Sequence, residues 1–275
     1  MRYVCIHGFK SFFYQFCPDL FLPEKIHILN ALFCAVIVFR IRQAYTLSQL
    51  IWKQKDKIGV KEEDDLTVRA AKLLKKETGY RGGVCIDIEK NLPMGGGLGG
   101  GSSDAATVLV VLNQLWQLGI SEQRLMELGV ALGADVPVFV KGTSTWAEGV
   151  GEKLTTIALP DAWFVIIKPQ CHVDTGKIFS ANDLTRDSKS ITISGFNSGD
   201  NQNDCSAVVR KRYIEVEQAL DGLDEYGQAR LTGTGACVFV QFSDRQSAQD
   251  VYSKLASDRE VYILCKSRWV KIFNF

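Results

Sequence analysis

The sequence predicts an α+β protein built of two domains, and three observations support that prediction. The chain has 275 residues, 46% hydrophobic and 23% charged, which is the composition of an ordinary globular protein. This length suits one large domain or two medium ones. The helices and strands that its patterns indicate mix without strict alternation, which favours α+β over a doubly wound sheet. A break around Pro160 places the expected domains at residues 1–157 and 158–275.

Charge and cysteine content narrow the functional classes. The formal net charge is +1, whereas a nucleic-acid-binding protein usually carries a strong basic field. The eight cysteines form no C-x-x-C pair and the three histidines show no ligand spacing, so we expect no metal site made by protein side chains. Scattered thiols in a chain of this size indicate reduced cysteines and a cytoplasmic protein. We expect no nucleic-acid or membrane partner, and an assembly that is a monomer or a homodimer.

Residues 1–55 differ in composition from the rest of the chain. They hold seven Lys or Arg but two acids, seven of the fifteen Phe, and one of the 24 Gly. The apolar run at residues 28–39 is too short to span a membrane, which takes about 20 residues, and it predicts a pair of buried strands. A second interpretation is a disturbed coding frame, because the composition changes abruptly near Asp56.

From Asp56 onward the pattern is regular and predicts each element in turn. Asp65 and Ser121 suit helix starts, and Gly79 and Gly119 suit helix ends. For the first domain the patterns predict a helix at 65–79, an alternating β-branched strand at 84–88, helices at 105–118 and 121–133, and an apolar strand at 136–140. For the second they predict a strand at 163–167, a helix at 210–223, a strand–glycine turn–strand unit at 231–242 and a helix at 247–255.

The glycine-rich stretch at residues 93–103 carries the main functional signal. Six of the seven residues from 95 to 101 are glycines, which lets the backbone turn sharply and approach a ligand closely. The stretch leads into a helix whose first N–H groups carry a partial positive charge, and Asp104 in the first turn suits that dipole. Loop and helix start together predict a phosphate site. The candidate binding residues are Pro93, Met94, Gly95, Gly96, Gly97, Leu98, Gly99, Gly100, Gly101, Ser102 and Ser103, the two serines capping the helix or binding phosphate or magnesium.

Three well-known loop types fit this stretch poorly. The dinucleotide pattern G-x-G-x-x-G is matched, but no acid closes a strand about 20 residues on, and Asp135 lies too far along the chain. The Walker pattern fails because no lysine follows the glycines. The protein-kinase set fails because neither H-R-D nor D-F-G occurs. A flexible linker is disfavoured by the apolar helix that follows directly.

The loop resembles the signature of the small-molecule kinases grouped as galactokinase, homoserine kinase, mevalonate kinase and phosphomevalonate kinase, the GHMP kinases. That signature reads Pro-x-x-x-Gly-Leu-Gly-x-x-Ser-Ser-x-Ala-Ala, and its places are taken here by Pro93, Gly97, Leu98, Gly99, Ser102, Ser103, Ala105 and Ala106. Within the family the match narrows to one member through residues 133–139, 146–152 and 231–239, and through the spacing of Asn203-Asp204.

The resemblance implies both a fold and a reaction. The fold would be two α+β domains with a cleft between them, the first binding ATP and the second lying on the substrate side. The enzyme would be a kinase that uses ATP and Mg²⁺ to phosphorylate a hydroxyl of a cytidine-diphosphate-linked methylerythritol in non-mevalonate isoprenoid synthesis. Asp135 would be the base that takes the hydroxyl proton, and Phe179 stands where the family stacks an aromatic ring on the cytosine.

The residues alone leave two roles open for Asp135 and for the second glycine stretch. Asp135 precedes the apolar run at 136–140, where a carboxylate is either functional or a helix-cap or turn residue. Residues 231–239 form either a loop that closes over phosphates or a tight turn between strands. We expect Cys237, in that stretch, to be a small buried residue rather than a nucleophile.

The resemblance stops near the N-terminus. The family's Pro-Ala-Lys-x-Asn strand, whose lysine pairs with the catalytic carboxylate, is missing, and so is its Gly-Tyr-His. Lys10 and His27 lie near those places, but the residues around them do not match the two motifs. Asp65 stands where the family often has an Asn that could recognise adenine. We hypothesise that residues 1 to about 57 are a corrupted reading. The alternatives are therefore an inactive or weakly active nucleotide-binding remnant, or a GHMP kinase with another small alcohol acceptor.

Overall fold

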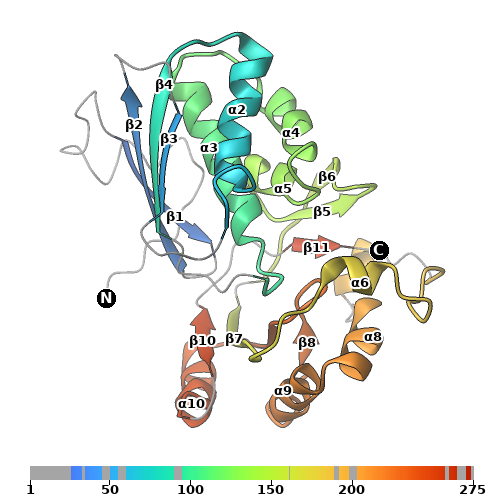
Figure 1. Cartoon of the computed structure of the whole chain (residues 1–275). Helices are drawn as coiled ribbons and strands as arrows, with labels where there is room; N and C mark the ends of the chain where they lie inside the picture. Colours follow the sequence, from blue (N-terminus) through green and yellow to red (C-terminus); the bar gives the residue numbers. More distant parts are fainter. Residues whose placement is uncertain are drawn as a thin grey trace. The chain divides into compact units, whose positions relative to one another are not determined.

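A computed structural model describes most of the chain as two compact units. The described residues are 26–32, 35–44, 50–54, 60–89, 95–160, 162–188, 192–197, 203–257, 260–264 and 271–273. Unit 1 comprises Met1–Leu92 and Gly99–Ile157, and unit 2 comprises Pro93–Leu98 and Ala158–Phe275 (Figure 1). The glycine-rich stretch is thus divided, its first part belonging to unit 2 and its second part to unit 1.

Unit 1 contains a mixed four-stranded sheet. Its strands are β1 (Ile26–Leu32), β2 (Ala35–Ala44), β3 (Leu50–Gln54) and β4 (Gly83–Glu89), in the order β1-β2-β4-β3. β1 and β2 form an antiparallel pair in which Ile28 lies opposite Phe39, so the strand pair predicted for residues 28–39 is present. β4 runs antiparallel to β2 and parallel to β3.

The helices of unit 1 bury one face of β4. They are α2 (Leu66–Thr78), α3 (Gly100–Leu115), α4 (Glu122–Val130) and α5 (Val136–Lys141), and they are followed by the antiparallel strands β5 (Thr145–Glu148) and β6 (Lys153–Thr156). Val84, Ile86 and Ile88 alternate along β4 and are fully buried, which confirms the predicted strand. They share one core with Leu74 of α2 and Leu109 of α3.

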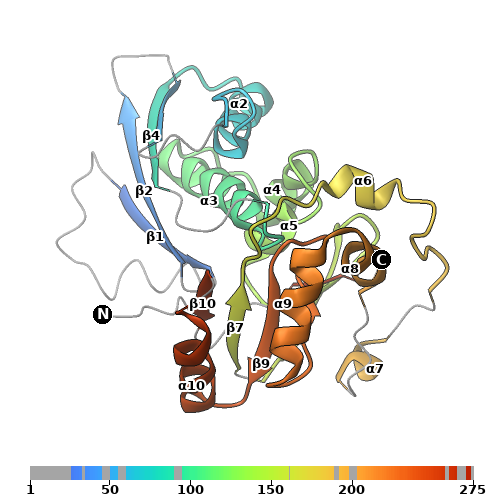
Figure 2. The same ribbon diagram turned by 60° about the horizontal axis from the view of Figure 1, so that its bottom comes forward.

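Unit 2 is built on an antiparallel sheet in the order β10-β7-β9-β8. Its elements are β7 (Trp163–Ile167), α6 (Thr175–Phe179), α7 (Ile193–Asn197), α8 (Cys205–Arg212), α9 (Ile214–Asp224), β8 (Arg230–Leu231), β9 (Val238–Phe242), α10 (Arg245–Leu255), β10 (Val261–Leu264) and β11 (Lys271–Phe273). α9 and α10 both pack against this sheet (Figure 2). The strand–glycine turn–strand unit predicted for residues 231–242 is confirmed.

Two predicted elements were wrong. Residues 136–140, expected to form a strand, lie in helix α5. Pro137 lies in the first turn of this helix, and Gly142, with φ +69°, is its C-cap. A short apolar run between helices fits either element, because periodicity alone does not separate a buried helix turn from a buried strand. The single helix expected at 210–223 is two helices, because Tyr213 between α8 and α9 adopts an extended conformation (φ −129°, ψ +95°).

The described residues contain neither a candidate membrane-spanning helix nor a candidate metal site. Among the described residues no helix combines the length and apolar character that a membrane crossing requires. Across the same part of the chain, no three His, Cys, Asp or Glu side chains are grouped so as to hold a metal ion.

Asp65 caps helix α2. It is 2% exposed and accepts hydrogen bonds from the backbone N–H of Thr67 (2.9 Å) and from the Thr67 hydroxyl. The cap satisfies one of the N–H groups that lack a partner within the helix. At the other end Gly79, with φ +68°, donates to the carbonyl of Lys75 and closes the helix.

We expect Asp65→Ala to lower the free energy of unfolding by about 1 kcal/mol, because the first turn of α2 loses its acceptor. Asp65→Asn is the matched control, since Asn caps helices as well as Asp does, and it should change stability by no more than about 0.5 kcal/mol. Urea unfolding of both variants measures the difference. An equal loss in both would show that the cap is not what Asp65 contributes.

Candidate functional site

The glycine loop owes its path to three left-handed residues. Gly95, Gly97 and Gly99 have φ values of +68°, +72° and +69°, a region that side chains other than glycine rarely adopt. Helix α3 begins at Gly100, five residues before the predicted start, and its N-cap is Gly99. The expectation that Ser102 or Ser103 caps the helix was therefore wrong, because both lie inside the first two turns. Pro93 and Met94 lie outside the described residues.

Within unit 2, the first part of the loop is held by the turn that joins β8 to β9. We call residues 232–237 the second glycine turn. The backbone N–H of Ala236 donates to the carbonyl of Gly95 (3.1 Å), and that of Cys237 donates to the carbonyl of Gly96 (3.3 Å). The hydroxyl of Thr232 also donates to the Gly96 carbonyl. These contacts join two segments about 140 residues apart in sequence.

The approach at Gly97 leaves no room for a side chain. A Cβ atom there would lie 2.2 Å from the carbonyl oxygen of Thr232 and 2.7 Å from its hydroxyl oxygen. Because a trans peptide sets its C=O and N–H in opposite directions, the peptides that give their carbonyls to the turn aim the N–H groups of Gly96 and Gly97 away from it. Backbone N–H groups arranged in this way suit an anion.

Within unit 1, helix α3 supplies the second part of the loop. Its first turn contains Gly100, Gly101 and Ser102, and the first helical hydrogen bond runs from Ser103 N–H to Gly99 carbonyl (2.9 Å). Ser102 is half-buried, whereas Ser103 is 1% exposed, so Ser102 is the more accessible of the two serines. Asp104 was expected in the first turn but is the fifth helical residue and is 1% exposed.

Asp135 lies at the start of α5 in the same unit. It occupies the N-cap position with φ −86° and ψ −22°, and its side chain is half-buried and does not cap the helix. The prediction that Asp135 opens a strand was wrong, for the reason given for residues 136–140. Its position at an element boundary was correct. Its carboxylate therefore makes no capping hydrogen bond at the start of α5.

The segment that carries Asp135 lies against the turn between β5 and β6 and against the start of α3. A Cβ atom on Gly151 would lie 2.1 Å from the carbonyl oxygen of Ala134, so the turn between β5 and β6 contacts the backbone next to Asp135. A Cβ atom on Gly133 would lie 3.8 Å from the hydroxyl oxygen of Ser102. Unit 1 thus brings together the start of α3, the segment that carries Asp135 and the β5–β6 turn, which are far apart in sequence.

The second glycine turn is itself fixed by hydrogen bonds. Gly233 and Gly235 have φ values of +51° and +96° in the turn that joins β8 to β9, and a role in closing over phosphates stays a prediction. Asn203, just before α8, donates from Nδ2 to the carbonyls of Leu231 (3.1 Å) and Gly233 (2.7 Å). Burial raises the pKa of the Cys237 thiol to about 12, which agrees with a buried structural residue and not with a nucleophile.

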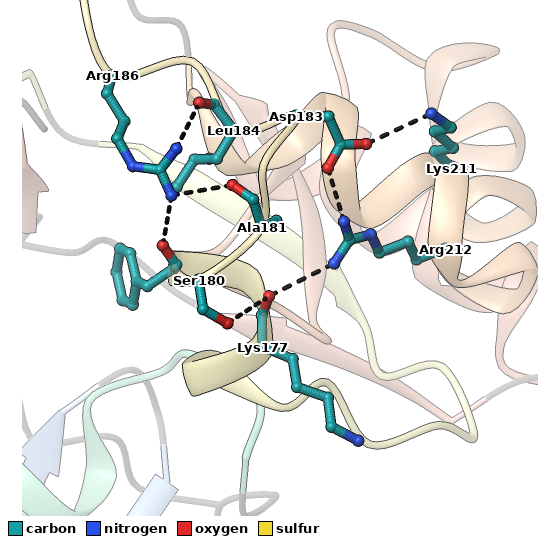
Figure 3. A network of polar contacts seen from close by, with 9 residues as sticks. Lys177, Ser180, Ala181, Asp183, Leu184, Arg186, Lys211 and Arg212 are labelled. Carbon is teal, nitrogen blue, oxygen red and sulfur yellow. Dashed lines mark hydrogen bonds and ion pairs between the residues drawn. The ribbon is translucent and has the colours of Figure 1, made fainter.

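Phe179 ends helix α6 and keeps 42% of its surface exposed. Around it, Arg186 donates to the carbonyls of Phe179 (2.7 Å), Ala181 (2.9 Å) and Leu184 (3.1 Å), as Figure 3 shows. Phe179 is the last residue of α6, where a helix leaves its carbonyls without partners within the helix, and Ala181 and Leu184 follow shortly after it. One arginine therefore fixes the backbone that presents the exposed ring.

Asp183 ties the same segment to α8. Its carboxylate accepts from Arg212 (2.6 Å) and Lys211 (3.4 Å) (Figure 3). Burial acts to raise the pKa of Asp183, but a backbone hydrogen bond and the two cations outweigh that effect, and the pKa falls below its usual range. Arg212 also donates to the carbonyl of Lys177 (3.4 Å). Sequence reasoning missed this network, because no motif links Arg186 or Asp183 to Phe179.

Comparison with known proteins agrees with these features. The family model for the GHMP kinases N terminal domain matches residues 65–143, and that for the GHMP kinases C terminal domain matches residues 184–260. The chain belongs to the GHMP kinase family, and within it to the 4-diphosphocytidyl-2-C-methyl-D-erythritol kinases.

Two relatives support the narrower group. The chain is 48% identical over 242 residues to the 4-diphosphocytidyl-2-C-methyl-D-erythritol kinase of Methylococcus capsulatus, covering 86% of this chain and 82% of the relative. It is 52% identical over 200 residues to the enzyme of the same name from Halorhodospira halophila, covering 72% of this chain and 69% of the relative.

Solved structures support the fold. The crystal structure of a 4-(cytidine 5'-diphospho)-2C-methyl-D-erythritol kinase superposes with a TM-score of 0.67 at 24% identity, covering 89% of this chain and 97% of the other. That of homoserine kinase from Cytophaga hutchinsonii gives 0.62 at 14% identity, covering 90% of each chain. The α+β two-domain GHMP-kinase class predicted from the sequence is confirmed.

We expect Gly97→Ala to abolish measurable ATP binding and to lower stability by about 1–3 kcal/mol. The added methyl group would collide with the Thr232 carbonyl, and a positive φ is strained for alanine. Gly79→Ala is the matched control: Gly79 has a φ of +68° and open space around it. The control should lose stability yet bind ATP as the wild type does, by isothermal titration calorimetry. Equal ATP affinity in both variants would contradict the role of the loop.

Proposed function

We propose that the chain is an ATP-dependent kinase that phosphorylates a hydroxyl of 4-diphosphocytidyl-2-C-methyl-D-erythritol in non-mevalonate isoprenoid synthesis. The observation that carries the proposal is the glycine loop whose carbonyls are held by the second glycine turn. Its relatives bear this enzyme's name at 48–52% identity. Residues 1–157 would form the ATP-binding domain and residues 158–275 the substrate-side domain.

The loop and the start of α3 bind the ATP phosphates in this proposal. Gly95 through Gly101 supply backbone N–H groups, and the helix dipole adds a partial positive charge at the same place. Ser102 contributes a hydroxyl, whereas Ser103 is buried and acts in packing. Phosphoryl transfer needs chiefly position and charge stabilisation, and a fixed backbone supplies both.

Asp135 takes the proton of the acceptor hydroxyl in this proposal. Two features support the role: Asp135 is half-buried at the start of α5, and a Cβ atom on Gly133, two residues before it, would lie 3.8 Å from the hydroxyl oxygen of Ser102 in the first turn of α3. In the reaction the acceptor oxygen bonds to the γ-phosphorus, the bond to the β–γ bridging oxygen breaks, ADP leaves, and the hydroxyl proton passes to Asp135. A positioned base contributes about 10²–10⁴-fold to the rate.

In this proposal Mg²⁺ binds together with the nucleotide. The hydroxyl of Ser102 is the side-chain oxygen at the loop that fits such an ion, because Mg²⁺ in kinases is held mainly by phosphate oxygens and water, with few protein ligands. When bound, the ion would neutralise charge on the transferring phosphoryl group.

Phe179 recognises the cytosine base in this proposal. Its ring is exposed while its backbone is held by Arg186, which lowers the entropy lost when a planar base stacks on it. The free thiols at Cys85, Cys171, Cys205 and Cys237 suit a cytoplasmic enzyme, which would act as a monomer or a homodimer.

The N-terminal segment favours a second candidate, a weakly active or inactive nucleotide-binding remnant. Lys10 lies outside the described residues, and His27 is described only as backbone in β1, opposite Arg40. A lysine beside the base would favour its ionised form and offset phosphate charge. Because the Pro-Ala-Lys-x-Asn motif is missing, we expect slow turnover even with ATP bound.

We expect ADP release from ATP and Mg²⁺ to depend on 4-diphosphocytidyl-2-C-methyl-D-erythritol, and Asp135→Asn to lower kcat about 10²–10⁴-fold with little change in ATP affinity. Asp244→Asn is the matched control: Asp244 caps α10, where Asn serves as well, and kcat should stay at the wild-type value. Unchanged kcat in Asp135→Asn would contradict the base assignment. A folded wild type that binds ATP without turnover would establish the remnant.

A further inference from the structure

We infer that Asn203 is a positioning residue for ATP binding, acting through the second glycine turn on the glycine loop. The inference rests on the proposed function, because it concerns the same loop. The hydrogen bonds of the Asn203 side chain go to Leu231, Gly233 and Cys205. Its Nδ2 group donates to the backbone carbonyls of Leu231 and Gly233, about 30 positions further along the chain. Asn203 therefore influences the glycine loop through the backbone of the second glycine turn.

The Asn203 side chain makes two long-range hydrogen bonds and one local hydrogen bond. Both Nδ2 protons point to carbonyls of the turn region, those of Leu231 (3.1 Å) and Gly233 (2.7 Å). Oδ1 accepts from the backbone N–H of Cys205 (3.0 Å), the first residue of α8. An amide side chain has two donor protons and an acceptor oxygen, so Asn203 joins α8 to the turn with both of its donors and its acceptor oxygen.

The two carbonyls that Asn203 binds lie on either side of Thr232. Thr232 is further fixed by its own N–H, which donates to the Cys237 carbonyl (2.9 Å), and by its carbonyl, which accepts from Gly235 (2.8 Å). With its backbone held on both sides, Thr232 directs its hydroxyl at the carbonyls of Gly96 and Cys237. Asn203 therefore holds the backbone on both sides of Thr232, whose hydroxyl donates to the loop.

The loop follows any movement of Thr232. Gly97 approaches so closely that a Cβ atom would lie 2.2 Å from the Thr232 carbonyl oxygen. The last two residues of the turn, Ala236 and Cys237, donate their backbone N–H groups to the carbonyls of Gly95 and Gly96. A shift of the turn would rotate these peptides and redirect the N–H groups of Gly96 and Gly97, because C=O and N–H are fixed in one plane.

Asn203→Asp separates this role from that of a simple helix cap. Aspartate keeps an acceptor for Cys205 N–H but has no donors, and it places negative charge against the carbonyls of Leu231 and Gly233. A residue that only caps α8 would tolerate the change. A residue that positions the turn would not.

Asn113 offers a matched control. It lies in α3 and makes the same kind of contact, donating from Nδ2 to the Ile120 carbonyl (2.8 Å) and accepting at Oδ1 from Ile120 N–H (3.0 Å). It is thirteen residues along α3 from Gly100, which is about 20 Å at 1.5 Å per residue. Asn113→Asp therefore removes a comparable donor contact far from the glycine loop.

The experiment measures three quantities for the full-length wild type and both variants: the thermal midpoint, amide hydrogen exchange of Ala236 and Cys237 without ligand, and the Kd of a non-hydrolysable ATP analogue with Mg²⁺. We expect both variants to lose thermal stability. Asn203→Asp alone should speed exchange at Ala236 and Cys237 about tenfold or more, and raise the Kd by a similar factor. Exchange or affinity at the wild-type level in Asn203→Asp would overturn the inference.

A second pair of variants keeps the test decisive if Asn203→Asp does not fold. Thr232→Val removes the hydroxyl that reaches Gly96, whereas Thr232→Ser keeps it. We expect the valine variant to show the weakened binding and the serine variant to resemble the wild type; equal Kd values for the two would overturn the inference. Protected Ala236 and Cys237 amides in a wild type that does not bind the analogue would instead contradict the proposed function.

Discussion

The structure of the candidate site depends on where the carbonyls of Gly95 and Gly96 point. Both are held by the second glycine turn, through Ala236, Cys237 and the hydroxyl of Thr232. A loop of six glycines in seven residues has high conformational entropy when unfolded, so it needs such contacts to keep one path. The constraint also explains why glycine is required at Gly97, where the Thr232 carbonyl leaves no room for a Cβ.

The local parts of the site could be predicted from the sequence, and the tertiary parts could not. Glycine spacing and the apolar run behind it located the glycine loop and α3. Asp135 was identified as a candidate, but the helix it begins was mistaken for a strand, because five apolar residues including Pro137 fit both elements. The bonds from Asn203 to Leu231 and Gly233, and from Arg186 to the end of α6, span irregular segments that no periodicity marks.

The N-terminal segment shows that the sheet of unit 1 forms without the family's lysine motif. β2 and β3 pair with β4, and β1 pairs with β2, all in a regular register, although the segment lacks the family's lysine motif. Backbone pairing depends on strand propensity and on β4 as a partner, whereas catalysis depends on particular side chains. The family's model begins to match at residue 65. A GHMP-kinase fold can therefore coexist with a change in the residues that assist the base.

The most direct test of the account follows the backbone amides of residues 95–103 by NMR while a non-hydrolysable ATP analogue and Mg²⁺ are titrated. If the held carbonyls aim the N–H groups at the phosphates, the largest shifts will fall on Gly96, Gly97 and the first turn of α3, and the Ala236 and Cys237 amides, already bonded to the loop, will shift little. Saturable binding that leaves the amides of Gly96 and Gly97 unshifted would contradict the account.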